Sequence, residues 1–312
     1  MTWIKDLQEG ASIKESFLVN NVTKGVTGNN MPYLTITLQD KTGTIDGKKW
    51  DVKSEDADIF TPGNIVQVSA DVIYYKNSYQ LKVLSGEKVE DEKIDYARYT
   101  MSAPVPQDEL EAQLKTILAS IKDEDISLLV NALIEKYYDK FVTYPAAVRN
   151  HHEFTNGLLY HTISMVGLAD KIASFYPSID RDLLVGGVLL HDLGKTIELS
   201  GPIIPKYTTE GKLLGHISIM AGEIRKIAEA LKIESEVPTL LAHMVLSHHG
   251  KMEFGSPVTP LLREALVLSM IDDLDAKMII LDKAYAETAE GEFTSRIYPI
   301  DDSYFYKQKT RK

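Results

Sequence analysis

The eight histidines of this chain all lie between His151 and His249, although the chain is 312 residues long. Histidine is the commonest metal-binding side chain, and a scatter over the whole length would rarely confine every copy to one segment. Two neighbouring pairs stand out: His191 with Asp192 in "LLHDLGK", and His248 before His249 in "LSHHG". Nitrogen and carboxylate ligands without sulfur suit Mn, Fe, Co or Zn. We therefore expect a metal site in this segment.

Most of these side chains lie at an end of a predicted helix, where side chains from several helices can meet. Some open a segment with apolar residues at helical spacing, the neighbouring pairs close such segments, and Asp272 and Asp273 lie inside a long one. One histidine at a helix start is usually an ordinary polar neighbour of the cap, but the whole set favours a shared site. The histidine and aspartate ligands expected from these ends are His161, His191, Asp192, His216, His248 and His249.

The other titratable residues of the segment have less defined roles. His243 lies five residues before the histidine pair, so we expect it to pack in the core or on the surface. Asp273 and Asp275 are expected on the helix surface or behind the ligands. His151 and His152, in "RNHHEFTNGLL", could face a substrate or fix the loop before the next helix, and the sequence leaves both interpretations open.

The pair His191 and Asp192 suggests a particular arrangement of cations. Neighbours on a helix point about 100° apart, so the two cannot chelate as an i, i+4 pair would. A carboxylate has two oxygens, however, and can bridge two ions about 3.5–4 Å apart. Lys195 follows four residues after His191 and shares its helix face. We expect Asp192 and Lys195 to act in catalysis, the lysine by holding a phosphate oxygen or steadying transition-state charge.

The elements that must position these residues form two regions. Residues 1–90 contain β-branched and aromatic runs separated by turn signals, which predicts an all-β barrel resembling an OB-fold. Residues 91–107 are charged and then proline-bearing, as in a linker. Residues 108–286 show helical periodicity, with helices expected at about 158–175, 181–195, 216–232, 237–249 and 260–286. Residues 287–312 form an aromatic and basic tail.

The bulk composition is that of a water-soluble chain. Apolar residues make up 44% and charged residues 25%, and there is no cysteine, which fits a reducing compartment. The N-terminus lacks the pattern of a signal peptide, and no apolar run approaches the roughly 20 residues of a membrane span. We expect a cytoplasmic protein without membrane contact. The net charge of −11 argues against coating nucleic acid through the bulk field, but not against a local basic groove or bound cations.

The spacing of these motifs resembles the HD-domain superfamily of metal-dependent phosphohydrolases. "HDLGK" matches the doublet with its following lysine, and "IDDLDA" selects Asp272 over Asp273 as the last ligand; this part of the resemblance covers about 145–285. The preceding barrel, with "HHEFTNGLLYHT" and "LSHHG", makes the whole chain similar to the YhaM-type 3′-to-5′ exoribonucleases of Gram-positive bacteria. That resemblance implies manganese-dependent removal of nucleotides from single-stranded RNA, with single-stranded DNA as a further substrate, and a homo-oligomer.

The resemblance also implies how the ligands divide between two divalent ions, most simply Mn²⁺, with Co²⁺ or Fe²⁺ as alternatives. One ion would be held by His161, His191, Asp192 and Asp272. Asp192 would bridge to the second ion, held by His216, His248 and His249. All seven positions match the family pattern.

The barrel offers candidate contacts for nucleic acid. Single-strand binding proteins combine aromatic stacking platforms with basic grooves. Aromatic residues along the predicted strands are Phe17, Tyr33, Trp50, Tyr74, Tyr75 and Tyr79, and at least half of them must fill the core. We favour Tyr33 and Trp50, which lie beside loops, with Lys24 and Lys49 among the lysines of the groove. Acidic residues slightly outnumber lysines in this region, so the local charge alone does not decide the question.

The leading hypothesis is a two-domain metal-dependent 3′-to-5′ exoribonuclease that releases nucleoside monophosphates from a strand held by the barrel. Two other classes remain. An HD-type phosphohydrolase of free nucleotides or cyclic dinucleotides would keep its turnover without residues 1–90. A non-catalytic single-strand-binding factor would bind tightly without a metal-dependent product, and the complete ligand set argues against it.

Overall fold

The computed structural model describes residues 2–75, 78–89, 94–95, 98–100, 103–146 and 155–310. The chain divides into two compact units, Met1–Ser102 and Ala103–Lys312. That division falls inside the segment 91–107, which the sequence marks as a linker. Both candidate substrate-facing histidines, His151 and His152, lie outside the described residues.

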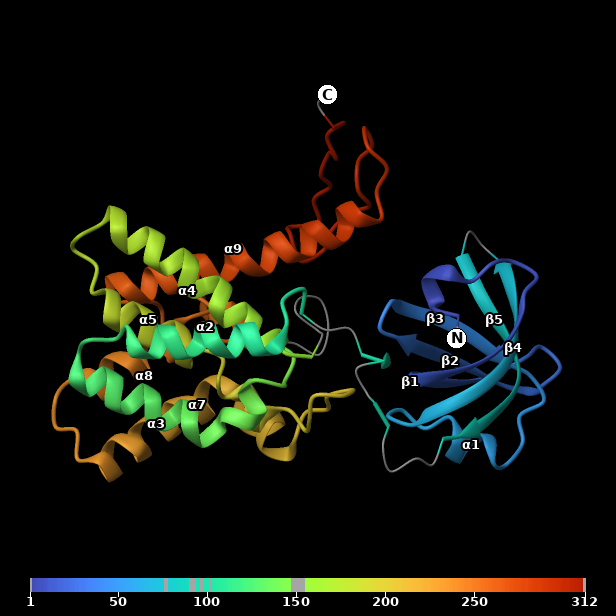
Figure 1. The fold of residues 1–312 in the computed structure, drawn as a ribbon, viewed down its shortest axis with the longest axis horizontal. Helices are drawn as coiled ribbons and strands as arrows, with labels where there is room; N and C mark the ends of the chain where they lie inside the picture. Colours follow the sequence, from blue (N-terminus) through green and yellow to red (C-terminus); the bar gives the residue numbers. More distant parts are fainter. Residues whose placement is uncertain are drawn as a thin grey trace. The chain divides into compact units, whose positions relative to one another are not determined.

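The first unit is a closed five-stranded barrel (Figure 1). Its strands are β1 (Ser12–Val26), β2 (Pro32–Asp40), β3 (Gly43–Lys49), β4 (Ile65–Tyr75) and β5 (Ser78–Lys88). They follow the order β1-β2-β3-β5-β4, in which β3 and β5 are parallel and the other neighbours are antiparallel. The short helices η1 (Ile4–Asp6) and α1 (Asp56–Ile59) accompany the strands. Alternate residues such as Leu34, Ile36 and Leu38 on β2 point into the core.

The second unit is helical, which confirms the predicted fold class of a β-barrel followed by an all-α region. Its elements are α2 (Gln107–Ala119), α3 (Glu124–Phe141), α4 (Gly157–Phe175), α5 (Arg181–Leu190), α6 (Lys195–Glu198), α7 (Thr209–Leu231), α8 (Val237–Ser247), η3 (Met252–Phe254) and α9 (Arg263–Ala286). Aspartate and threonine side chains cap three of them: Asp123, Asp180 and Thr208 each accept a backbone N–H from the first turn. Within the described ranges, every helix is too short or too polar to span a bilayer.

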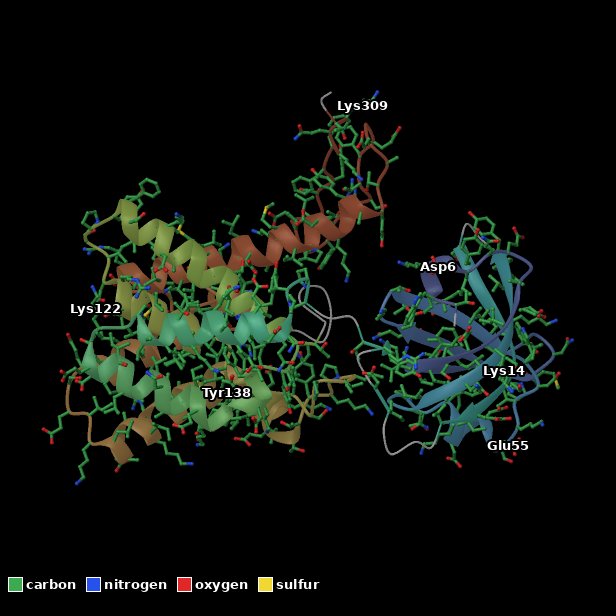
Figure 2. The ribbon with its side chains drawn as sticks, in the orientation of Figure 1. Asp6, Lys14, Glu55, Lys122, Tyr138 and Lys309 are labelled. Carbon is green, nitrogen blue, oxygen red and sulfur yellow. The ribbon has the colours of Figure 1, made fainter. Side chains whose placement is uncertain are left out.

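Helix α5 lies at the centre of this unit and packs against α3, α4, α8 and α9. Its residues from Leu183 to Leu190 are all buried, because an apolar run with two glycines lets neighbouring helices approach on every side. Around it, Tyr138 of α3, labelled in Figure 2, donates to Glu111 of α2 at 2.8 Å. The helix that leads into the "HDLGK" motif is therefore packed on several faces.

Two helix bounds differ from the bounds that hydrophobic periodicity predicts. Helix α5 ends at Leu190 rather than about 195, since His191–Gly194 forms a turn before the short α6. Helix α7 begins at Thr209 rather than 216, but it is kinked at Gly215, whose φ of 72° is non-helical. The expected start at His216 is thus the start of the second part of α7.

The residues expected to form a tail pair with one another beyond α9. Phe293 bridges to Tyr306 and Ile297 to Ser303, so 291–307 folds back on itself as an irregular antiparallel ribbon. Figure 2 labels Lys309 near its end. Several basic groups there already have partners: Lys307 donates to the carbonyls of Tyr285 and Thr288.

Candidate metal centre

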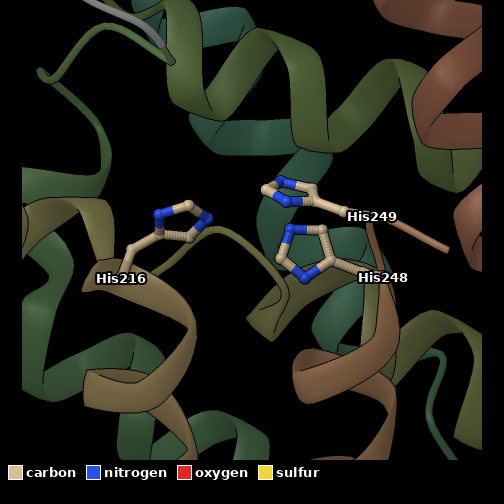
Figure 3. Close-up of side chains that lie close together, drawn as sticks. All are labelled: His216, His248 and His249. Carbon is tan, nitrogen blue, oxygen red and sulfur yellow. The ribbon is translucent and has the colours of Figure 1, made fainter. Parts of the chain in front are cut away.

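The structure brings the seven expected ligands together in two adjoining groups. We call His161, His191, Asp192 and Asp272 the histidine–aspartate group, and His216, His248 and His249 the three-histidine group. The atoms that can bind a metal in His161, His191 and Asp192 lie within 4.8 Å of one another, and so do those of the three-histidine group. Figure 3 shows the rings of the latter turned toward one another.

Asp192 lies between the two groups and turns one oxygen to each. Its Oδ2 is 3.3 Å from His191 Nε2 and 3.8 Å from His161 Nε2. Its Oδ1 is 3.4 Å from His216 Nε2 and 3.8 Å from His248 Nε2. A single carboxylate can therefore serve both groups.

Helix α9 supplies the carboxylate that completes the histidine–aspartate group. Asp272 Oδ1 lies 3.4 Å from His161 Nε2. The next residue, Asp273, turns to solvent and pairs with Lys277 at 2.6 Å. Of the two neighbouring aspartates, the structure therefore brings only Asp272 to the cluster.

Each histidine is oriented by a hydrogen bond at Nδ1, which leaves Nε2 directed at the cluster. The rings of His191 and His248 bond to the carbonyls of Val188 and Val245, each at 2.7 Å and each three residues back on the same helix. His249 bonds to the Phe254 carbonyl at 2.8 Å. Such partners fix the tautomer and orientation of metal-binding histidines.

Two carboxylates perform the same task for the remaining rings. Asp275 Oδ2 lies 2.7 Å from His161 Nδ1, and its other oxygen, Oδ1, accepts a hydrogen bond from Ser164 Oγ at 2.6 Å. Glu198 Oε1 lies 3.2 Å from His216 Nδ1 and accepts the His216 backbone N–H. A position behind the ligands was one of the alternatives for Asp275, whereas the role of Glu198 was missed. Its only signal was a carboxylate between apolar neighbours in "TIEL".

The donor set fits divalent cations. Asp192 Oδ1, His216 Nε2 and His248 Nε2 are buried and have no hydrogen-bond partner within the described part of the chain. A buried polar atom without a partner is unfavourable by about 1–3 kcal/mol. The two ring nitrogens both lie within 3.8 Å of Asp192 Oδ1. A cation between them would satisfy all three at once, which supports the metal-site interpretation.

The electrostatics favour the metal-binding protonation states at most of the cluster. Burial would raise the pKa of Asp192, but the Lys195 ammonium and the His191 ring hold that pKa well below its usual range. Burial, together with the neighbouring rings of His191 and His249, holds the pKa of His248 well below its usual value. The carboxylate is therefore charged and the imidazole neutral near pH 7, as cation binding requires.

His161 and Lys195 place positive charge in the same region. Burial alone would lower the pKa of His161, but its hydrogen bonds to Asp272 and Asp275 raise that pKa to about 9. Lys195 Nζ donates to Asp192 Oδ2 at 2.7 Å. Its ammonium thus lies directly at the shared carboxylate, although His191 and Lys195 are separated by a turn and not joined by one continuous helix as predicted.

A glycine allows the two groups to lie so close. A Cβ at Gly194, in the "HDLGK" turn, would collide with the backbone carbonyl of His216. The backbone that carries Asp192 can therefore approach the backbone that carries His216 only if position 194 has no side chain. His243 stays outside both groups, where its Nε2 accepts the Leu261 N–H at 2.9 Å.

On the barrel, the structure gathers some of the expected aromatic and basic residues and not others. The rings of Tyr33 and Trp50 lie 4.9 Å apart, and Lys48 Nζ is 5.0 Å from the Tyr33 ring centre. Lys49, which we expected in the groove, is instead buried and ion-paired with Asp56 at 3.6 Å. The strand alternates, so Lys48 and Lys49 point to opposite faces.

The remaining barrel candidates divide by register and burial. Lys24 is exposed but is paired with Leu34, whose side chain enters the core, so it lies on the opposite strand face from Tyr33. Phe17 is fully buried in the core. Tyr74 and Tyr79 are half exposed and pack edge to face at 5.2 Å on the β4–β5 hairpin.

A barrel of this topology and a helical unit with this ligand cluster define a class: an OB-fold joined to an HD-type metal-dependent hydrolase. Comparison with protein families supports both the OB-fold and the HD domain. Residues 18–89 match the OB-fold nucleic acid binding domain, and residues 158–277 match the HD domain, whose members bind divalent metals.

Full-length relatives narrow the class. The chain is 46% identical over 299 residues to the 3′-5′ exoribonuclease YhaM of Geobacillus sp., covering 96% of this chain and 92% of that protein. It is 44% identical over 304 residues to the 3′-5′ exoribonuclease YhaM of Bacillus subtilis, covering 97% of each. Among solved structures, the second OB-fold domain of replication protein A from Methanococcus maripaludis matches 30% of this chain and all of that domain, with 19% identity and a TM-score of 0.23. The sequence relatives show that this chain belongs to the YhaM family of 3′-5′ exoribonucleases.

Proposed function

We infer that this chain is a metal-dependent 3′-5′ exoribonuclease acting on single-stranded nucleic acid, with RNA as the preferred substrate and DNA as a further one. The observation that carries the inference is the position of Asp192, whose two oxygens face two separate groups of ligands. Membership of the YhaM family supports the direction and the substrate class. The products would be nucleoside monophosphates.

We propose that the two groups hold one divalent ion each, and that both ions are Mn²⁺, since the set contains only imidazole and carboxylate donors. His161, His191 and Asp272 would hold one ion, the three-histidine group the other, and Asp192 both. When bound, such a pair supplies Lewis-acid stabilisation of the attacking and leaving oxygens of a phosphodiester.

The side chains around the ligands have separate tasks in this proposal. Lys195 carries a full positive charge beside Asp192, because the Asp192 carboxylate raises its pKa despite burial. An ammonium in that position can hold a non-bridging phosphate oxygen and stabilise negative charge as it develops. Asp275 and Glu198 keep the His161 and His216 rings in one orientation. None of these groups needs to move far during turnover.

The barrel would retain the strand. Tyr33 and Trp50 form a pair of rings on which bases can stack, and Lys48 adds a cation beside them. Gly25 lies directly under Tyr33, where a side chain would collide with the ring, so that the ring can lie across the neighbouring strand. Lys24 is exposed but lies on the opposite strand face from Tyr33, so in this proposal it would contact phosphates away from the stacking rings, and Lys49 is omitted because its ammonium is buried.

Two further expectations remain proposals: a cytoplasmic location and a homo-oligomer. The absence of cysteine supports a reducing compartment. Self-association is supported by four apolar side chains at i, i+4 spacing along α9 that are about half exposed or more: Leu266, Met270, Leu274 and Met278. Light scattering coupled to size exclusion tests the oligomer, and a monomer at micromolar concentration would contradict it.

The decisive experiment uses a 5′-labelled single-stranded RNA incubated with Mn²⁺ or with EDTA. We expect a ladder that shortens from the 3′ end only with metal, and none with Asp192→Asn. Asp273→Asn is the matched control, because that neighbouring aspartate of the same chain is exposed and paired with Lys277. An uncut but retarded RNA would indicate a binding factor, and turnover of free nucleotides alone would indicate a small-molecule phosphohydrolase.

A further inference from the structure

The turn that follows the three-histidine group carries exposed apolar side chains next to the cluster. In residues 250–255, Met252 is 69% exposed and Phe254 59%. Lys251 Nζ lies 5.3 Å from the centre of the Phe254 ring. An aromatic ring with a cation beside it is the arrangement that single-strand-binding proteins offer to a base and its phosphate.

The backbone of this turn is fixed to a ligand of the cluster. The Phe254 carbonyl accepts the His249 Nδ1 hydrogen bond at 2.8 Å, and the His249 N–H donates to Ser256 Oγ at 3.1 Å. Inside the turn, the N–H groups of Phe254 and Gly255 donate to the carbonyls of Lys251 and Met252. The carbonyl oxygen that orients His249 belongs to Phe254 itself, so the backbone position that carries this ring is fixed next to the three-histidine group.

The ring itself contributes little to folding. More than half of it is exposed, and the contact that orients His249 is made by the main chain, which any residue at this position would supply. A large aromatic side chain on a backbone fixed to His249 is thus available to a ligand. The proposed substrate presents a flat base at the nucleotide whose phosphodiester is cleaved.

We propose that Phe254 stacks on the base of the 3′-terminal nucleotide and positions that nucleotide in the site. The Lys251 ammonium beside the ring pairs at 3.5 Å with the exposed Glu253 carboxylate, and it would exchange that partner for the phosphate of the bound nucleotide. This proposal rests on the exoribonuclease activity proposed above. Stacking reads no hydrogen-bonding edge, so it accepts all four bases, as an enzyme that removes successive nucleotides requires.

The test is a double-mutant cycle in which the Phe254 ring and the terminal base of the substrate are removed singly and together. Wild type, Phe254→Ala and Phe254→Trp are assayed with Mn²⁺ on 5′-labelled RNA that ends either in a normal nucleotide or in an abasic one. We expect Phe254→Ala to raise KM about tenfold on normal RNA with kcat within about twofold, equivalent to about 1.4 kcal/mol. Phe254→Trp should restore the wild-type KM. On abasic ends, wild type and Phe254→Ala should have equal KM.

The controls separate this proposal from the function on which it depends. Manganese content by elemental analysis should be unchanged in Phe254→Ala, because the carbonyl that holds His249 remains. Phe175→Ala removes another exposed ring, 77% exposed at the far end of α4 and about 21 Å along that helix from His161, and should leave KM unchanged. Absence of 3′ trimming by wild type would refute the exoribonuclease function. Trimming by wild type with an equal Phe254→Ala effect on normal and abasic ends, or with no effect, would refute the stacking role alone.

Discussion

The two halves of the metal centre satisfy their polar atoms in different ways. In the histidine–aspartate group, His161 lies between Asp272 and Asp275, and its pKa is raised to about 9, so a proton can take the place of a cation. In the three-histidine group, the Nε2 atoms of His216 and His248 are buried and have no hydrogen-bond partner among the residues that the structure describes. Asp192, Asp272 and Asp275 all lie against the first group, whereas the second has the shared Asp192 and, behind His216, Glu198. A cation that binds the first half must therefore compete with a proton on His161, whereas the second half already presents unprotonated ring nitrogens to a cation.

The largest effect is expected from the residue that the two halves share. Asp192→Asn replaces a charged bridge by a neutral amide, so both halves should lose their metal and turnover should fall on the order of a thousandfold or more. Elemental analysis and single-turnover rates with Mn²⁺ measure the two losses. If the variant kept one equivalent of metal and most of its rate, the two halves would be independent and the comparison would fail.

A smaller effect should distinguish the carboxylates behind the ligands. Glu198→Gln should weaken metal binding in the three-histidine half about 10–100-fold, because it loosens His216, while the histidine–aspartate half keeps its affinity. Isothermal titration with Mn²⁺ would show one weakened and one unchanged site. Glu229→Gln, at an exposed position of α7, the helix that carries His216, is the matched control. Equal weakening of both sites would show that the halves act as one unit.

Gly194→Ala should strain the contact between the halves. Its Cβ would collide with the His216 carbonyl, so we expect a loss of about 1–3 kcal/mol in the free energy of unfolding and weaker binding at the three-histidine half. Chemical denaturation and metal titration measure the two effects. Gly222→Ala on α7 is the control, because the space around that position is open. Unchanged stability in Gly194→Ala would show that the backbones can separate without consequence.

The smallest effect is a difference in proton release. Below pH 9, metal binding at His161 must displace a proton, so the histidine–aspartate half should release about one proton at pH 7.5 and gain affinity as pH rises toward 9. At the three-histidine half, the pKa values of His248 and His249 are lowered from 6.5, so these rings are already neutral and release none. Calorimetry in buffers of different ionisation enthalpy counts the protons. Equal release from both halves would contradict the assignment.

The sequence and the family resemblance of its motifs were sufficient to predict the order of the two regions and the side chains that meet in the cluster. Hydrophobic periodicity and turn residues are local signals, and they predicted a barrel followed by helices. Clustering of histidines at helix ends predicted six of the seven side chains that the structure brings together, and the family resemblance of "IDDLDA" added Asp272. Local rules also predicted the helix that starts at His216, although α7 extends before its kink.

Only the tertiary structure decided what stands behind and between those ligands. Glu198 reaches His216 across 18 residues, and Asp275 reaches His161 across 114, so no local pattern marks either contact. The same holds for Lys49, whose burial against Asp56 follows from strand alternation inside a closed barrel. Residue type and spacing determine which side chains can bind a metal. Which oxygen of Asp192 faces which group, and which rings lack a partner, depends on long-range packing of α4, α5, α7, α8 and α9, because that packing sets the distances between segments far apart in the chain.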